Sequence, residues 1–223
     1  MAARRLWLTG SASAAVAIYA LMWIGYGLQW NWLTDIDDWA LGTLHAFGVA
    51  HPGWVTAWDV FCTVLGPTAF RLVTLIVIVV ALTRRNLRTA MFLVVSVELS
   101  GLLTEIAKTA ANRPRPATAL VLAPSSSFPS GHALGVLVGV LALLTVAWPV
   151  LRPSLRGWLI AAGAAIVVLI GVGRVVLNVH HPSDVVAGWA LGYAYYVLCL
   201  LILRPATPIT EADETPAVPD TAR

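Results

Sequence analysis

Charged residues are scarce in this chain. Only 11% of its 223 residues are Asp, Glu, Lys or Arg, whereas charged residues make up about a quarter of an ordinary soluble domain. Hydrophobic residues account for 59% of the chain, and its mean hydropathy is +0.81. Several apolar runs reach the roughly 20 residues that a helix needs to cross a bilayer. The composition excludes a soluble globular domain and predicts an all-α, polytopic membrane protein.

Lysine and cysteine are nearly absent as well. Lys108 is the only lysine, so arginine supplies every other basic position. Cys62 and Cys199 both lie inside apolar runs, where we interpret them as small core residues, and their positions give no information about a disulfide. The formal net charge of +3 comes from basic residues scattered between the apolar runs. Because a nucleic-acid-binding surface has clustered basic residues, we expect no nucleic-acid partner.

The apolar runs predict about six membrane spans. Their expected limits are residues 8–30, 54–82, 88–108, 131–150, 157–177 and 183–203. Gly66-Pro67 lies inside the second run, which predicts a kink there. The first run extends to about Leu28, which is longer than the apolar region of a signal peptide. We interpret it as an uncleaved first span rather than as a cleaved signal.

Eight arginines near the ends of the spans fall on one side under this threading. They are Arg4, Arg5, Arg84, Arg85, Arg88, Arg152, Arg156 and Arg204. The positive-inside rule assigns that side to the cytoplasm, which places both chain ends there in a plasma-membrane protein. Residues 205–223 are rich in proline and acidic residues, which predicts a disordered cytoplasmic tail.

Segment 34–47 falls on the outer side, and its apolar residues recur at helical spacing. They are Ile36, Trp39, Ala40, Thr43, Leu44 and Phe47. Asp37, Asp38 and His45 fall elsewhere on the helical wheel. The pattern predicts a short amphipathic helix on the outer membrane surface. Thr34 would cap its start, and Asp37, three residues later, would complete a capping box. The alternative is a loop whose periodicity is accidental.

Four ionisable residues fall within expected spans: Asp59, Arg71, Glu98 and Glu105. Charges inside a membrane are costly and are usually paired. Arg71 and Glu98 lie at similar depths on two antiparallel spans. We therefore expect an ion pair between Arg71 and Glu98.

Three polar segments fall at the outer ends of successive spans. They read KTAANRPRP (residues 108–116), PSGH (129–132) and GRVVLNVHHPSD (173–184). The first and third segments contribute a cluster of cations: Lys108, Arg115 and Arg174. The guanidinium fork of arginine matches two phosphate oxygens at once.

The PSGH step opens the fourth span and suits an anion. Ser130 is a good N-cap, and Gly131 lets the backbone approach a ligand closely. The first amides of a helix have no partner within it and point toward whatever lies before the helix. The cations and this helix start therefore predict a phosphate site.

The histidines add reactivity to this site. Pro182 suits the first turn of a helix, which places Asp184 in the same turn, where the helix dipole favours its ionised form. Asp184 can accept the Nδ1 proton of His180 and leave Nε2 free as a nucleophile. His132 is available as a proton donor to a leaving oxygen. One alternative is that the histidines are plain interfacial residues and the arginines only set the topology. The other is a metal site with His132, His180, His181 and Asp184 as ligands. The three nearby cations would repel the metal ion.

The order K-x6-RP, PSGH and R-x5-H-x3-D resembles the type 2 phosphatidic acid phosphatase superfamily. The matching residues are Lys108, Arg115, Pro116, Pro129, Ser130, Gly131, His132, Arg174, His180 and Asp184. The superfamily includes bacterial lipid phosphatases, glucose-6-phosphatase-type enzymes and soluble vanadium haloperoxidases, of which the composition disfavours the last. This chain has Gly173 where the family often has Ser, so one hydroxyl contact to the motif is not expected here.

The resemblance implies a catalytic role for each motif. His180 would form a phosphohistidine, Asp184 would orient it, and His132 would protonate the leaving oxygen and then assist the attack of water. The phosphoryl oxygens would be held by Lys108, Arg115, Ser130, Gly131 and Arg174, with no metal and no other cofactor. Residues 1–204 would form the membrane phosphatase domain.

The placement of the motifs suggests a lipid substrate at the outer face of the membrane. The candidates are polyprenyl diphosphate such as undecaprenyl diphosphate, phosphatidylglycerophosphate and phosphatidic acid. Arg113 is a cation additional to the motif residues and is either a contact to a second phosphate or an exposed loop arginine. A lipid-linked phosphotransferase with the same phosphohistidine and a non-catalytic phospholipid-binding membrane protein are the alternative functions. The sequence does not give the oligomeric state.

Overall fold

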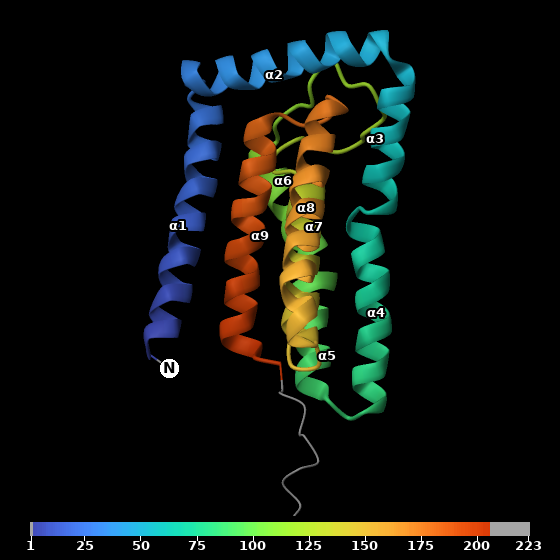
Figure 1. Ribbon diagram of the computed structural model, residues 1–223. Coiled ribbons are helices and arrows are strands. Elements are labelled where there is room, and N and C mark those ends of the chain that lie inside the picture. Colours follow the sequence, from blue (N-terminus) through green and yellow to red (C-terminus); the bar gives the residue numbers. More distant parts are fainter. Residues whose placement is uncertain (1, 206–223) are drawn as a thin grey trace, which may run out of the picture.

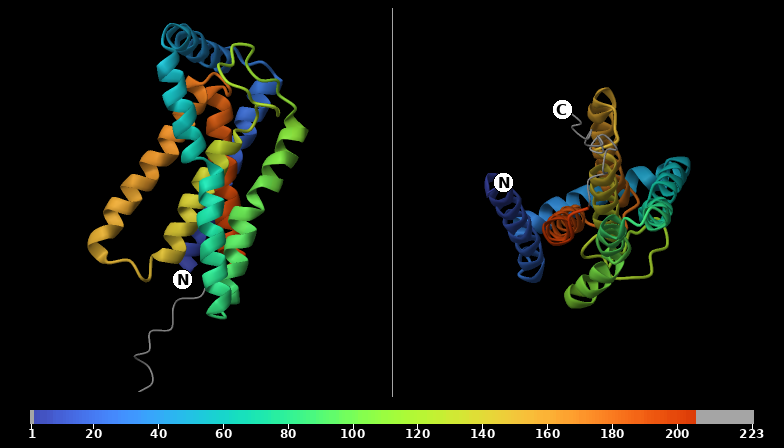
Figure 2. Two further views of the ribbon diagram at one scale, coloured as in Figure 1. Left: turned by 90° about the vertical axis from the view of Figure 1, so that its right-hand side faces the viewer. Right: turned by 90° about the horizontal axis from the view of Figure 1, so that it is seen from below.

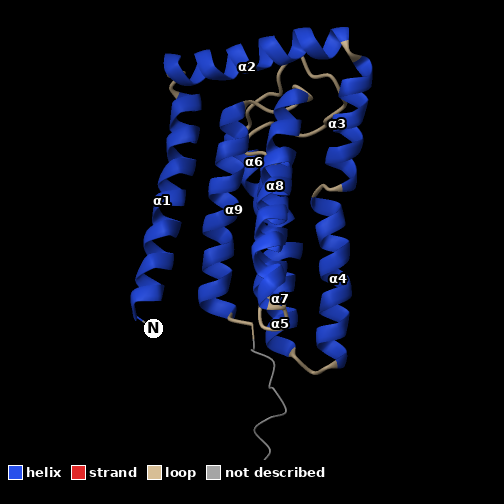
Figure 3. Ribbon diagram, in the orientation of Figure 1, coloured by secondary structure: helices blue, strands red, loops and turns tan. Residues whose placement is uncertain are grey.

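The computed structural model describes residues 2–205, and every regular element among them is helical (Figures 1 and 3). The elements are α1 (Ala2–Gly27), α2 (Asn31–Ala50), α3 (Pro52–Val64), α4 (Pro67–Thr83), α5 (Leu87–Leu93), the π-helical η1 (Val94–Glu98), α6 (Ser100–Ala111), α7 (Gly131–Ala147), α8 (Pro153–Val176) and α9 (Pro182–Leu203). The predicted all-α class is confirmed. All but the first residue of the predicted disordered tail lies outside the described residues.

Five helical segments of residues 2–205 are long and apolar enough to cross a membrane. They are Ala2–Gly27, Pro52–Thr83, Leu87–Ala111, Pro153–Val176 and Pro182–Leu203. Helix α7 is equally apolar in character but shorter, at 17 residues. The six predicted spans correspond to these six segments, and the protein is a multi-pass membrane protein.

The predicted kink at Gly66-Pro67 is a complete break between α3 and α4. Gly66 is extended, with φ −75° and ψ −178°, and Pro67 begins the next helix, where its missing N–H costs nothing. A side chain at position 66 would collide with the carbonyl of Cys62 and would lie 3.4 Å from the ring of His132. The break therefore brings the backbone of the second span close to the start of α7.

Helix α2 crosses one end of the bundle above the connecting loops (Figure 1). The helix predicted over 34–47 is thus confirmed, although it extends over Asn31–Ala50. The predicted capping box is wrong, because α2 begins at Asn31 and the Thr34 hydroxyl donates to the carbonyls of Trp30 and Asn31 within the helix. Asp37 is 1% exposed and faces the protein.

Helices α7 and α9 form the centre of the bundle, and α1 packs on its edge against α9 (Figure 2). The crossing of α7 and α9 is very close at Gly188, where a Cβ atom would lie 2.5 Å from the carbonyl oxygen of Ser130. At the same level the amide of Ser130 donates to the carbonyl of Asp184 over 2.9 Å. The glycine therefore lets the N-termini of α7 and α9 lie side by side.

The ends that carry most of the scattered arginines gather at the opposite end of the bundle from α2. They are the start of α1, the α4–α5 turn, the α7–α8 turn and the end of α9 (Figures 1 and 2). The two ends of the bundle thus differ in charge as the threading predicts. Which end is cytoplasmic stays a prediction.

Arg71 and Glu98 are neighbours but do not form the predicted contact. Within residues 2–205, no ion pair joins them at 4.0 Å or less, and both Arg71 Nε and Glu98 Oε1 are buried without a hydrogen-bond partner. The Arg71 guanidinium packs against Gly101, one turn after Glu98. The two side chains are thus close enough to interact electrostatically but do not form a direct ion pair.

This arrangement predicts a charge-balance effect on stability. Arg71→Met should lower the free energy of unfolding, because an uncompensated charge near a membrane centre costs about 2.5–3.5 kcal/mol on insertion scales. Adding Glu98→Gln should recover part of the loss. Thermal unfolding of the purified variants in detergent measures both effects, and a double variant no more stable than Arg71→Met would contradict the charge balance.

Candidate active site

Two left-handed residues end the helices that deliver the polar segments. Asn112 caps α6 with φ 45°, and Asn178 follows α8 with φ 53°. Asparagine tolerates this conformation better than most residues, which explains its place at both ends. The loop after Asn112 is held against the end of α8, because the Thr118 hydroxyl donates to Asn178 over 2.8 Å and the Leu120 amide donates to the carbonyl of Leu177. The polar segments therefore meet beneath α2.

The two predicted cations Lys108 and Arg115 are held by one serine that the sequence analysis did not select. Lys108 is 6% exposed, and its ammonium donates to the Ser125 hydroxyl over 2.6 Å. Arg115 donates through Nε to the Ser125 carbonyl and through Nη1 to the Val179 carbonyl, each over 2.6 Å. Ser125 lies in the run SSSF just before PSGH. Its closeness to that motif was the only signal in the sequence that it belongs to the site.

Arg174 completes the cation cluster from the last turn of α8. It is 7% exposed, and its Nε is buried without a hydrogen-bond partner among residues 2–205. Asp59 and Cys62 of α3 lie close enough to interact with it electrostatically. A buried guanidinium donor without a protein acceptor is poised to receive an anion.

Gly173 has a packing reason in this chain. A Cβ atom at position 173 would lie 2.6 Å from the Sγ atom of Cys62 and 2.7 Å from the ring of Trp58. Both distances are shorter than van der Waals contact, so the serine that often precedes this arginine would not fit without movement of α3. Cys62 and Trp58 thus occupy the space of the missing hydroxyl.

The PSGH step opens α7 as predicted. Ser130 is fully buried at the N-cap, and its hydroxyl accepts weakly from the Ala133 amide at 3.5 Å. Gly131 lets α6 approach, because a Cβ atom there would lie 3.0 Å from Thr104 and 4.0 Å from the side chain of Lys108. His132 follows, within electrostatic range of Lys108, Arg115, Arg174 and His180.

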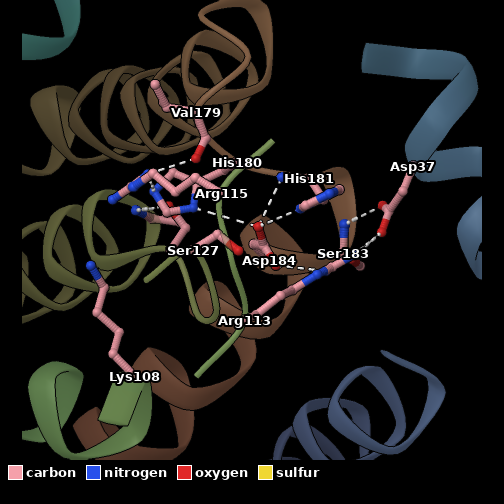
Figure 4. Close-up of polar contacts among 12 residues, drawn as sticks. Asp37, Lys108, Arg113, Arg115, Ser127, Val179, His180, His181, Ser183 and Asp184 are labelled. Carbon is pink, nitrogen blue, oxygen red and sulfur yellow. Dashed lines mark hydrogen bonds and ion pairs between the residues drawn. The ribbon is translucent and has the colours of Figure 1, made fainter. Parts of the chain in front are cut away.

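His180 lies at the centre of the cluster and is 1% exposed (Figure 4). Its Nε2 atom is 3.3 Å from Nη1 of Arg115, which can only donate, so Nε2 carries the lone pair. Burial lowers the pKa of His180 to about 4, with Arg115 and Arg174 acting in the same direction and the carboxylate of Asp184 opposing them. The imidazole is therefore neutral at physiological pH.

Asp184 is fully buried in the first turn of α9, where Pro182 stands at the first position as predicted. Its Oδ2 atom accepts from the amide of His181 over 2.8 Å and is 3.1 Å from Nδ1 of His181. The same oxygen is 3.6 Å from Nδ1 of His180, which is longer than a hydrogen bond. The predicted His180–Asp184 pair is thus adjacent but open, a common state for catalytic hydrogen bonds before a substrate binds.

The position of Arg113 differs from both expectations. It is 6% exposed rather than a free loop arginine, and its guanidinium faces carboxylates rather than an open phosphate site. Nη1 is 2.7 Å from Oδ1 of Asp184, and Nη2 is 2.9 Å from Oδ2 of Asp37 (Figure 4). Because these acidic residues occupy its donors, we do not assign Arg113 to a second phosphate.

Asp37 and Ser183 belong to this site, although neither was predicted as a site residue. The Ser183 hydroxyl and amide both donate to Asp37, the amide over 3.0 Å. Leu33, Asp37 and Leu41 are buried residues of α2 four positions apart, so Asp37 interrupts an apolar stripe. That spacing was the available signal. Within the described part of the chain, no three His, Cys, Asp or Glu side chains are grouped to hold a metal ion.

Two curated proteins share parts of this sequence. One stretch of 66 residues, 30% of this chain, is 42% identical to an undecaprenyl-diphosphatase of Sulfolobus acidocaldarius and covers 28% of that protein. Another of 122 residues, 50% of this chain, is 33% identical to a lipid A 1-phosphatase of Rhizobium johnstonii and covers 46% of it. The chain thus spans less than half the length of each of these relatives.

A solved structure has the same fold. The transmembrane PAP2-type phosphatidylglycerolphosphate phosphatase of Bacillus subtilis superimposes with a TM-score of 0.71 over 85% of this chain and 94% of that chain, at 21% identity. The family model of the PAP2 superfamily matches residues 89–208, which is more than half of the chain and encloses all three polar segments. The protein therefore belongs to the PAP2 superfamily.

Proposed function

We propose that this protein is a phosphatase that hydrolyses a phosphate or diphosphate ester of a membrane lipid. The observation that carries the proposal is the buried, neutral imidazole of His180, whose Nε2 faces a guanidinium at 3.3 Å within a cluster of cations. An imidazole lone pair beside fixed positive charge suits attack on a phosphoryl group. The relatives named as undecaprenyl-diphosphatase and lipid A 1-phosphatase support a lipid phosphate as substrate.

The first chemical step is an in-line displacement at phosphorus. Nε2 of His180 forms a bond to phosphorus while the bond to the leaving oxygen breaks. His132, which is protonated once the anionic headgroup offsets the surrounding cations, donates its proton to that oxygen. The charge on the equatorial oxygens is stabilised by cations and by the start of α7, namely Lys108, Arg115, Arg174, the Ser130 hydroxyl and the Gly131 amide. The product of this step is a phosphohistidine.

The second step returns the enzyme to its starting state. Water attacks the phosphohistidine, His132 takes a proton from that water, and inorganic phosphate leaves as the His180 lone pair is restored. The phosphorylated ring is cationic, so its Nδ1 proton is drawn toward the carboxylate of Asp184, which closes the 3.6 Å gap. Asp184 thus stabilises the phosphohistidine intermediate more than it stabilises the free enzyme. An interaction that strengthens along the reaction in this way accelerates it.

The position of the cluster between membrane helices supports a lipid substrate. The site lies at the end of the bundle that α2 crosses, and large apolar side chains are exposed along α4 and α6 below it. A lipid with its tail beside these helices can present its headgroup to the cations. Under the positive-inside orientation this end is the extracytoplasmic face of the plasma membrane.

A substrate panel tests this function. Purified wild-type protein should release inorganic phosphate from polyprenyl diphosphate, phosphatidylglycerophosphate or phosphatidic acid, and His180→Ala should abolish release because the nucleophile is missing. His51→Ala is the matched control, because His51 is an exposed histidine at the end of α2. Phosphate release by His180→Ala at the wild-type rate would contradict the proposal. Phosphate that appears only on an added acceptor would identify a transferase.

The contribution of His132 to catalysis should depend on the leaving group of the substrate. A diphosphate leaves as a phosphate, which needs protonation less than an alkoxide does. His132→Ala should therefore lose at least about tenfold more kcat/KM on a lipid monophosphate than on a diphosphate with the same chain, within the usual 10²–10⁴-fold range of acid catalysis. Equal losses on the two substrates, measured side by side, would remove the general-acid role from His132.

A further inference from the structure

We propose that Asp37 and Arg113 are positioning residues, through which the surface helix α2 holds the catalytic carboxylate of Asp184 in place. The inference rests on the proposed function of His180 and Asp184. It concerns Asp37, which lies outside the three motifs, and Arg113, which occupies one of the variable positions of K-x6-RP.

Asp37 reaches from α2 into the first turn of α9. Its Oδ1 atom accepts the amide of Ser183 over 3.0 Å, and its Oδ2 atom accepts the Ser183 hydroxyl over 2.5 Å and Arg113 over 2.9 Å. Both oxygens are therefore used, at a residue that is 1% exposed. A buried carboxylate with this many partners is held rigidly, and it fixes α2 to the start of α9 (Figure 4).

Arg113 links this carboxylate to that of Asp184. One of its terminal nitrogens donates to Asp184 and Ser183, each over 2.7 Å, and the other donates to Asp37. Its guanidinium also lies over the ring of Tyr26 in α1, 4.6 Å from the centroid. Arg113 is thus held by contacts from α1, α2 and α9.

The consequence for Asp184 is that only one of its oxygens remains for an imidazole. Arg113 occupies Oδ1, which leaves Oδ2 between Nδ1 of His181 at 3.1 Å and Nδ1 of His180 at 3.6 Å. A small rotation of the carboxylate or of the imidazole rings decides which histidine Nδ1 atom forms a hydrogen bond with Oδ2. Arg113 limits that rotation, and Asp37 in turn limits the movement of Arg113.

The charges of this chain of contacts also matter for His180. Asp37, Arg113 and Asp184 together carry one net negative charge, so part of the Asp184 charge is compensated by Arg113. The other titratable or charged groups around His180 are Arg115, Arg174, His132 and His181. All of these remain in place when Arg113 or Asp37 is changed, so a changed pH profile reports on the Asp37–Arg113 pair.

Arg113→Met is the first test. Without its guanidinium, Asp184 offers its full charge to the imidazoles, which should raise the pKa of His180 from about 4 by about one unit. Because a protonated imidazole cannot attack, activity is lost as pH falls through this pKa, so the acid limb of kcat/KM should move to higher pH. The ratio of variant to wild type on one lipid diphosphate cancels the titration of the substrate.

Asp37→Asn is the second test and should act differently. It keeps an acceptor for the Ser183 amide but frees Arg113 to compensate Asp184 more fully. The acid limb should therefore stay in place or move to lower pH, while kcat falls about tenfold to a hundredfold with little change in KM, the cost of a misplaced catalytic group. Arg113→Lys keeps the charge but not the fork, so it should keep the wild-type limb at a reduced kcat.

Asp38→Asn and Arg84→Met are the matched controls, since both positions are exposed and lie outside the site. Both should behave as wild type. If Arg113→Met does not fold, the kcat of Asp37→Asn and the profile of Arg113→Lys still decide the matter. Wild-type kcat in Asp37→Asn, or a parallel loss at every pH in Arg113→Met, would overturn the positioning role. An active wild type with an inactive His180→Ala would leave the proposed function intact in that case.

Discussion

The ion pair between Arg113 and Asp184, at 2.7 Å, is the interaction on which the polar end of this protein depends. A carboxylate with no exposed surface needs full compensation, because an unpaired buried charge would cost several kcal/mol. Asp184 receives it from Arg113 in the α6–α7 loop and from the His181 amide in its own turn, while its carbonyl accepts from Ser130 of α7. The charge therefore ties α9, α7 and the loop together, and the same group is the one that an attacking imidazole requires.

The cations around His180 follow the opposite logic. Lys108 is held by Ser125, whereas Arg174 keeps a buried donor without a protein partner, and Arg115 lies against an imidazole rather than a carboxylate. Among residues 2–205, no carboxylate forms a direct ion pair with Lys108, Arg115 or Arg174, because Asp37 and Asp184 pair with Arg113 and the histidines instead. This separation of charge keeps an anion-binding surface beside a neutral nucleophile, which is the condition for electrostatic catalysis of phosphoryl transfer.

Much of this architecture could be predicted because the signals are local in sequence. Apolar runs give the spans, Gly66-Pro67 gives the break between α3 and α4, and the three polar segments give the cations and histidines in order. The network of Asp37 and Arg113 could not be predicted from local patterns, because the two residues are 76 positions apart and meet only in the folded protein. Ile36 and Trp39 indicated an amphipathic helix, yet they form its exposed face, while the buried stripe contains Asp37.

The central claim is that Nε2 of His180 becomes covalently bonded to phosphorus. The most direct measurement is to quench the enzyme in alkali during turnover of a ³²P-labelled lipid phosphate and to map the labelled peptide by mass spectrometry. The account predicts an acid-labile, alkali-stable phosphate on the peptide that contains His180. No labelled protein at any time during turnover, or a phosphate on another residue such as His132, would contradict it.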